Sequence, residues 1–177
     1  MGVKGIQFKS AQMFKMNLKK IASNTFIILI IFLMDRFFKI YILKIAELES
    51  NVDIYINSYL NFYLIWNKGI AFGLFSFEDT LIYQLISLVI FAICIVLTFM
   101  IIKSDGLKKY ALISILGGAT GNLFDRIYYS AVPDFIDFHI NGFHWFIFNL
   151  ADIFITIGIM CLILDEIIFY KKNNEIK

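Results

Sequence analysis

The sequence contains little proline, cysteine or histidine, with one proline, two cysteines and two histidines in 177 residues. Both cysteines, Cys94 and Cys161, lie inside apolar runs. Neither has a nearby histidine or cation that would stabilise a nucleophilic thiolate. We expect both to be small buried hydrophobic residues, and a lipid-buried position does not suit a disulfide. The cysteines therefore indicate neither cysteine catalysis nor a redox compartment.

Several common motifs of hydrolytic enzymes and binding proteins are also missing. The two histidines, His139 and His144, are not at the i,i+4 spacing of a metalloprotease helix, and no H-E-x-x-H occurs. We expect both to serve core or interfacial packing. The sequence has no G-x-S-x-G nucleophile elbow, no G-x-G-D motif of the presenilin type and no basic-aromatic surface for nucleic acid.

Apolar residues dominate what is present. Hydrophobic residues make up 60% of the chain and the mean hydropathy is +0.77, whereas about half of a soluble domain is apolar. The length allows one domain, and the composition predicts a polytopic membrane protein. Each of four apolar segments is close to the roughly 20 residues that span a bilayer. They cover about residues 21–45, 80–102, 107–128 and 149–170.

The distribution of lysine predicts the orientation of these segments. Residues 1–20 form a basic segment without acidic residues, and lysines also follow the second and fourth apolar segments. On the other side, segments 46–79 and 129–148 contain Lys68 as their only lysine. By the positive-inside rule, both termini are cytoplasmic. We therefore expect a membrane domain over residues 21–170 and a cytoplasmic tail over 171–177.

The two outer segments carry strand-like sequence. Residues 52–57 alternate apolar and polar side chains, and residues 60–66 continue in strand-rich residue types. Segment 134–148 has a similar composition and is expected to add another strand. The predicted fold is mainly α, with four transmembrane helices and a small β-sheet on the outer, periplasmic side.

Two carboxylates near the C-terminus suggest aspartyl chemistry. Pro133 cannot continue a helix, so Asp134 is expected just past the third apolar segment, while Asp152 lies at the start of the fourth. Two carboxyl groups in a low-dielectric site share one proton, as in an aspartic protease. Alternatively, Asp152 is a favourable charge at a helix N-terminus and Asp134 a solvated loop residue. Spacing alone leaves both readings open.

Amide and glycine residues recur beside these acids. Asn149 lies three residues before Asp152, so both are expected on one helical face, and Asn122 and Asp125 have the same relation. Glycines 118 and 121 lie one turn earlier and permit close approach of a helix or substrate backbone. The alternative is a stripe of small residues that only packs helices.

The remaining charges have structural explanations. Asp35 and Lys39 are an i,i+4 pair that can neutralise each other. Arg126 either extends toward headgroups or pairs with a carboxylate. Asp125 rivals Asp134 as the second acid, but its neighbour Arg126 makes a structural ion pair the better reading. The glycine-punctuated loop from Asn67 to Gly73 is suited to holding an extended substrate.

Taken together, these motifs resemble the lipoprotein signal peptidase family, also called signal peptidase II. The resemblance extends over about 150 residues from Asp35 onward and includes D-R-x-x-K at Asp35 and N-x-G-x-A-F at Asn67. Its most specific part is an ordered triple: Gly121-Asn122…Asp125-Arg126, then Val132-Pro133-Asp134-Phe135, then Phe148-Asn149-Leu150-Ala151-Asp152.

The resemblance implies an intramembrane aspartyl protease of the bacterial inner membrane. Such enzymes cut prolipoproteins just before a diacylglyceryl-modified cysteine, need no metal or cofactor and are blocked by globomycin. They act among membrane lipids, and we expect a monomer. Asp134 and Asp152 match the catalytic pair. The positions matching substrate-binding or supporting residues are Asp35, Lys39, Asn67, Gly69, Gly118, Asn122, Asp125, Arg126, Val132, Asn149 and Ala151.

Two departures and one alternative accompany this interpretation. Many family members carry glycine where Ser130 stands and a second valine where Pro133 stands. The alternative function is a small ion-coupled transporter or channel subunit, with Asp35, Asp125 and Asp152 as a proton or cation path. Such a path should continue to the cytoplasmic side, yet the cytoplasmic halves of the segments carry almost no ionisable residues.

Overall fold

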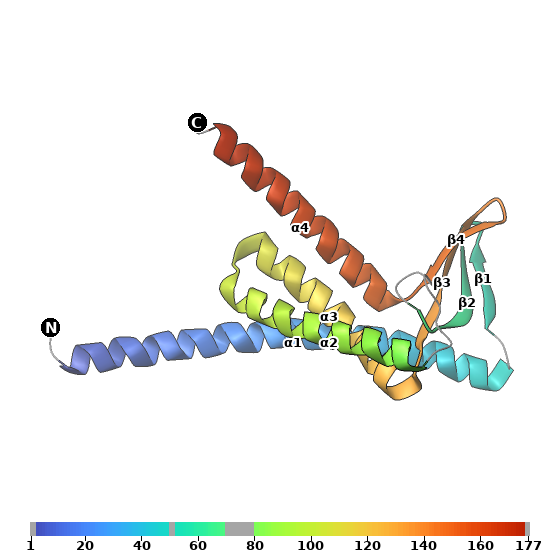
Figure 1. The fold of residues 1–177 in the computed structure, drawn as a ribbon, viewed down its shortest axis with the longest axis horizontal. Coiled ribbons are helices and arrows are strands. Elements are labelled where there is room, and N and C mark those ends of the chain that lie inside the picture. Colours follow the sequence, from blue (N-terminus) through green and yellow to red (C-terminus); the bar gives the residue numbers. More distant parts are fainter. Residues whose placement is uncertain (1–2, 50–51, 70–79, 176–177) are drawn as a thin grey trace.

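The computed structural model describes residues 3–49, 52–69 and 80–175 and is mainly helical, with one antiparallel sheet at one end (Figure 1). The sheet lies beside the C-terminal end of α1 and the N-terminal end of α4. The beginning of α1 and the end of α4 lie on the side away from it. In chain order the elements are α1 (Val3–Glu49), β1 (Asp53–Asn57), β2 (Leu60–Asn67), α2 (Thr80–Lys103), α3 (Gly106–Tyr129), β3 (Val132–Ile140), β4 (Phe143–Phe148) and α4 (Leu150–Glu175).

The helices cover the four apolar segments, and α1 and α4 extend beyond the predicted bounds. Helices α2 and α3 agree with prediction within one residue at each end. Helix α4 begins at Leu150 rather than Asn149 and continues to Glu175 rather than ending near residue 170. Helix α1, however, starts at Val3, so the basic residues before position 21 continue the first helix instead of forming a separate lead-in. No proline stands in this stretch to end the helix.

The sheet has the order β1-β2-β3-β4, and every neighbouring pair is antiparallel. The two predicted outer strands are present. Segment 134–148 forms two strands rather than one, because Asn141 and Gly142 make a two-residue turn with φ of 51° and 79°. Asn-Gly is the preferred pair for such a hairpin turn, since both positions need positive φ.

The chain between α3 and β3 explains both departures from the family pattern. Helix α3 ends in Ser130, which has the left-handed conformation (φ 54°, ψ 24°) in which glycine is common at helix C-termini. Pro133 pairs with Trp66 of β2, and pairing of β3 with β4 begins only at Ile136. Because one side of β3 is unpaired at Pro133, the missing N–H fits there.

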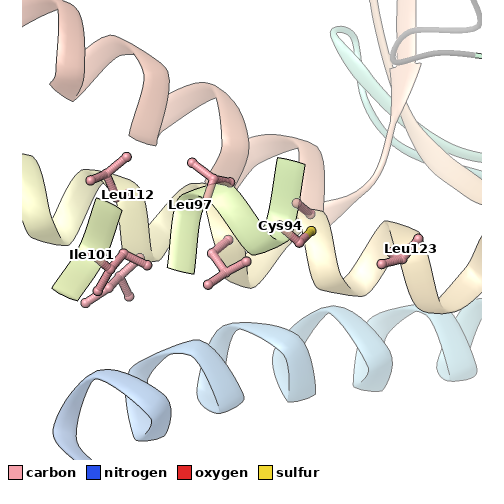
Figure 2. Close-up of a cluster of buried hydrophobic side chains, with 8 residues drawn as sticks. Cys94, Leu97, Ile101, Leu112 and Leu123 are labelled. Carbon is pink, nitrogen blue, oxygen red and sulfur yellow. The ribbon is translucent and has the colours of Figure 1, made fainter. Parts of the chain in front are cut away.

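Helix α3 is the centre of the bundle and packs on α1, α2 and α4. Leu112 and Leu123 of α3 meet Cys94, Leu97 and Ile101 of α2 in a buried apolar cluster (Figure 2). Cys94 therefore has the packing role expected from sequence.

Glycines set the close approach of α3 to its other neighbours. A Cβ atom on Gly118 would collide with the carbonyl oxygen of Ala151, and one on Gly121 would lie 2.7 Å from Oδ2 of Asp35. On α4, a Cβ at Gly158 would lie 2.7 Å from the carbonyl oxygen of Ala111. The expectation that the α3 glycines permit close packing is thus confirmed for both positions.

Among the described residues, one helix is both long and apolar enough to cross a membrane, Leu81–Lys103. Charged residues lower the hydropathy of α1 and α3. Several of them nevertheless face the protein interior, because Asp35, Lys39 and Asp125 have no exposed surface.

Candidate active site

Asp134 is fully buried on β3, in the part of the strand that pairs with β2. Each of its carboxylate oxygens accepts a hydrogen bond from a side-chain amide. Nδ2 of Asn67, at the end of β2, donates to Oδ2 over 2.8 Å. Nδ2 of Asn149 donates to Oδ1 over 2.6 Å. The sequence placed Asp134 after the third helix, and the structure shows that it belongs to a strand rather than to a loop.

Asp152 is held by the cap at the N-terminus of α4. The backbone N–H of Asn149 donates to Oδ2 of Asp152 over 3.2 Å, and the backbone N–H of Asp152 donates to Oδ1 of Asn149 over 3.1 Å. This reciprocal pair is a capping box. Asn149 is therefore the N-cap, not a member of the helical face predicted from its spacing. Oδ1 of Asp152 accepts a further bond of 2.8 Å from Nδ2 of Asn122.

The side-chain amides of three asparagines are oriented by the hydrogen bonds that their Oδ1 atoms accept. Oδ1 of Asn67 accepts the N–H of Gly69 over 2.8 Å, and Oδ1 of Asn149 accepts that of Asp152. Oδ1 of Asn122 accepts a bond of 2.8 Å from Nζ of Lys39, which has no acceptor capacity. Each NH₂ group must therefore point at a carboxylate. The three amides hold Asp134 and Asp152 in place without adding a net charge.

Behind the amides lies a buried network of two acids and two cations. Nζ of Lys39 lies 2.9 Å from Oδ2 of Asp35 and 2.6 Å from Oδ2 of Asp125. Arg36 contacts both acids as well. Two negative and two positive charges balance, as buried ions require. Oδ1 of Asp35 also accepts the N–H of Ala151 over 3.0 Å, which ties α1 to the first turn of α4.

The predicted pair of Asp35 and Lys39 is confirmed, but the predicted partner of Asp125 is wrong. Its cations are Arg36 and Lys39 of α1, not the adjacent Arg126. Consecutive residues of a helix point in different directions, so Arg126 faces elsewhere. Its guanidinium donates instead to two backbone carbonyl oxygens, that of Asn122 over 3.2 Å and that of Gly69 over 3.1 Å.

The two acids face a common cavity of about 190 Å³. The cavity is lined by the polar residues Asp134 and Asp152 and by the apolar residue Val132. Sequence reasoning missed the apolar residues that line the same cavity: Ile90, Ile93, Leu97, Ile115, Ala119 and Ile155. The other polar lining residues are Asn67, Asn122, Arg126 and Asn149. Positions 70–73 of the loop from Asn67 to Gly73 lie outside the described residues.

The histidines meet a residue that the sequence did not single out. His139 and His144 stack with ring centroids 5.2 Å apart, which fits the packing expected of them. Both rings also lie beside Asp137, a buried acid of β3. The alternation of β3 places Asp137 and His139 on one face, and this signal could have suggested the cluster.

A family profile described as signal peptidase (SPase) II matches residues 27–168, which is most of the chain. The chain belongs to the signal peptidase II family. It is 57% identical over 162 residues to a lipoprotein signal peptidase of Pelagibacter ubique (strain HTCC1062), covering 91% of this chain and 98% of that protein. It is 37% identical to the lipoprotein signal peptidase of Francisella tularensis subsp. novicida (strain U112), covering 89% and 100%.

Solved structures of bacterial membrane enzymes share the fold. A bacterial membrane enzyme superposes with a TM-score of 0.67 at 27% identity, covering 83% of this chain and 88% of that chain. The protein is thus a membrane peptidase with a mainly helical fold and a small antiparallel sheet. The transporter reading also loses its support within the molecule, because Asp35 and Asp125 are ion-paired with Arg36 and Lys39.

Proposed function

We propose that the protein is an aspartyl endopeptidase that removes the signal peptide from diacylglyceryl-modified prolipoproteins, with Asp134 and Asp152 as its catalytic pair. The observation that carries this proposal is the meeting of two buried carboxylates at one cavity, each held by amide donors. The relatives named above are lipoprotein signal peptidases, which supports the substrate class.

The surroundings of the pair favour a shared proton. Burial raises the pKa of Asp134 to about 7, and the nearby charge of Asp152 contributes in the same direction. The hydrogen bonds from Asn67 and Asn149 oppose this rise. Near neutral pH the pair therefore holds one proton. One carboxylate takes a proton from the attacking water while the other, as an acid, polarises the scissile carbonyl.

The cavity accommodates the reacting atoms and not the whole substrate. One water occupies about 30 Å³ of liquid, so about 190 Å³ holds the attacking water and a small part of the scissile segment. The acyl chains on the substrate cysteine would stay in the lipid beside the helices. The apolar residues that line the cavity suit the hydrophobic end of a signal peptide.

Arg126 is the best-placed residue for holding the substrate backbone. It is buried and lines the cavity. Two of its N–H groups donate to the backbone carbonyl oxygens of Asn122 and Gly69. Among the described residues, nothing accepts a hydrogen bond from its Nε. This nitrogen has no accessible surface, so we assign substrate contact to the guanidinium of Arg126, which belongs to the cavity lining. Asn67, Asn122 and Asn149 complete the polar side of the site, and Val132 adds an apolar contact. Gly69 bonds to Asn67 and Arg126. The residues that support the site from behind are Asp35, Lys39, Gly118, Asp125 and Ala151.

The proposed topology has four membrane-spanning helices, with both termini in the cytoplasm and the site near the outer face of the inner membrane. Exposed apolar side chains on every helix support it, since soluble proteins rarely expose such extensive patches. Examples are Leu33 and Phe37 on α1, Leu85 on α2, Ile127 on α3 and Ile163 on α4. The spanning domain then comprises residues 21–170, preceded by the basic segment 1–20 and followed by the tail 171–177.

Cleavage of a diacylated prolipoprotein by the purified enzyme tests the function. We expect release of the signal peptide from the diacylated substrate, inhibition by globomycin, and no cleavage of the same substrate without its lipid. The unlipidated substrate and a heat-inactivated enzyme are the controls. Equal cleavage of lipidated and unlipidated substrate would contradict the proposed specificity, and cleavage of neither would contradict the function.

The shared proton predicts a loss of activity at alkaline pH. Asp134 is protonated below its pKa of about 7 and ionised above it, so raising the pH removes the acid that the mechanism needs. We expect kcat/KM to fall about tenfold per pH unit well above this pKa. Initial rates with a diacylated substrate between pH 6 and 9 measure the effect, with thermal unfolding at each pH as the control for stability. A flat profile up to pH 9 would exclude a shared proton with this pKa.

A further inference from the structure

A second cluster of chemically active side chains lies on the β3–β4 hairpin. Nδ1 of His144 lies 2.7 and 2.9 Å from the two carboxylate oxygens of Asp137. Nδ1 of His139 lies 3.7 Å from Oδ2 of the same carboxylate. One ligand atom from each residue can be chosen so that all three lie within 4.8 Å of one another. None of the three residues lines the catalytic cavity described above.

The hairpin register brings these side chains together. Asp137 and His139 are two residues apart on β3 and project from one face of the strand. His144 of β4 is the cross-strand partner of His139, because the register shifts between Phe138 and His139 and skips Trp145. Side chains at such a pair lie about 5 Å apart at their Cβ atoms, and the two rings stack. The cluster is therefore fixed by strand geometry rather than by mobile loops.

Two features go beyond an ordinary histidine–aspartate pair. Asp137 has only 2% of its surface exposed, and Nδ1 of His139 is buried without a hydrogen-bond partner among the described residues. A single hydrogen bond between Asp137 and His144 would leave that nitrogen unsatisfied. A cation shared by all three residues would satisfy it and neutralise the buried carboxylate.

We propose that Asp137, His139 and His144 bind one divalent transition-metal cation of the Zn²⁺ class. Two imidazole nitrogens and a carboxylate oxygen are a common ligand set for Zn²⁺, whose fourth position is taken by water. Imidazole ligands favour Zn²⁺, Cu²⁺ or Ni²⁺ over Mg²⁺ and Ca²⁺, which prefer oxygen. Ligand atoms around a tetrahedral Zn²⁺ lie about 3.3 Å apart, so atoms within 4.8 Å of one another need to approach by at most about 1.5 Å.

A bound metal ion would connect β4 to β3, the strand that also carries Asp134. The cation would act as a cross-link of the hairpin and would take no part in peptide hydrolysis. The site is accessible, because the side chain of His144 is 57% exposed while Asp137 forms its base. The ion can therefore enter from solvent without opening the fold.

Titration of the metal-free, untagged protein in detergent with Co²⁺ tests the proposal. The chain has only two histidines, so an imidazole-bound Co²⁺ signal in the visible spectrum reports on this cluster. We expect one equivalent to bind and Zn²⁺ to displace it. His144→Gln and His139→Gln should each weaken binding by about 100-fold or more, since even loss of a residue behind a metal ligand costs 10–100-fold.

Asp53→Asn, which removes an exposed carboxylate on β1, is the matched control and should bind as the wild type does. Zn²⁺ should also raise the Tm of the wild type and leave that of His144→Gln unchanged. His144 is exposed, so this variant is expected to fold. Absence of Co²⁺ binding by the wild type would overturn the proposal. Binding that persists unchanged in both histidine variants would overturn it too, because the ion would then occupy other groups.

Discussion

Asp134→Asn and Asp152→Asn are each expected to lower the rate of prolipoprotein cleavage by about 10⁴-fold or more, as loss of one member of a catalytic unit does in other proteases. Each change replaces a group that exchanges protons with water by an amide that cannot. The second carboxylate cannot act alone, because it would have to accept the proton of water and polarise the carbonyl at once. The two variants should therefore be similarly inactive, and the double variant no worse.

The control for these variants has to separate lost chemistry from lost structure. At 134 an asparagine turns its NH₂ toward Asn67 or Asn149, both of which donate to that position. We expect a cost of about 1–3 kcal/mol for the resulting unsatisfied donor, which thermal unfolding in detergent measures. Asp53→Asn makes the same chemical change at an exposed site and should process substrate normally. Wild-type cleavage by either active-site variant would rule out the proposed pair.

Local sequence signals predicted the parts of the fold that depend on local chemistry. The lengths of α2 and α3 follow from apolar runs between charged ends. The Asn141-Gly142 turn was not predicted, although the preference of that pair for positive φ is a local signal for it. The start of α1 was not predictable from hydropathy, because its first turns are basic rather than apolar. Helix formation depends on backbone hydrogen bonds and not on apolar residues alone.

Contacts between distant parts of the chain were harder to predict. Lys39 and Asp125 are 86 positions apart, so sequence proximity pointed to Arg126 as the partner of Asp125 instead. The choice is made by how α1 packs against α3, which the close approach at Gly121 permits. The motifs did bring Asp134, Asp152 and the three asparagines to attention, but not the role of each amide. That role depends on which donor bonds to the Oδ1 atom of each asparagine, because this bond sets the direction of the NH₂ group.

Lys39→Met is expected to destabilise the protein by about 3–5 kcal/mol, the cost of removing one partner from a buried ion network. Lys39 has no exposed surface and contacts Asp35, Asp125 and Asn122. Without it, two buried carboxylates face Arg36 alone. The side-chain oxygen Oδ1 of Asn122 also loses the donor that orients the Asn122 amide toward Asp152. Activity of the folded fraction should fall together with Tm.

A second change distinguishes unbalanced charge from lost packing. Lys39→Met combined with Asp125→Asn leaves Asp35 with Arg36, so the buried charges balance again. We expect the double variant to unfold at a higher temperature than Lys39→Met, although it still lacks the donor to Asn122 and should stay less active than the wild type. Lys44→Met removes an exposed lysine of the same helix and should change neither Tm nor activity. If the double variant is less stable than the single one, the cost of Lys39→Met arises from lost packing, because restoring charge balance would then bring no gain.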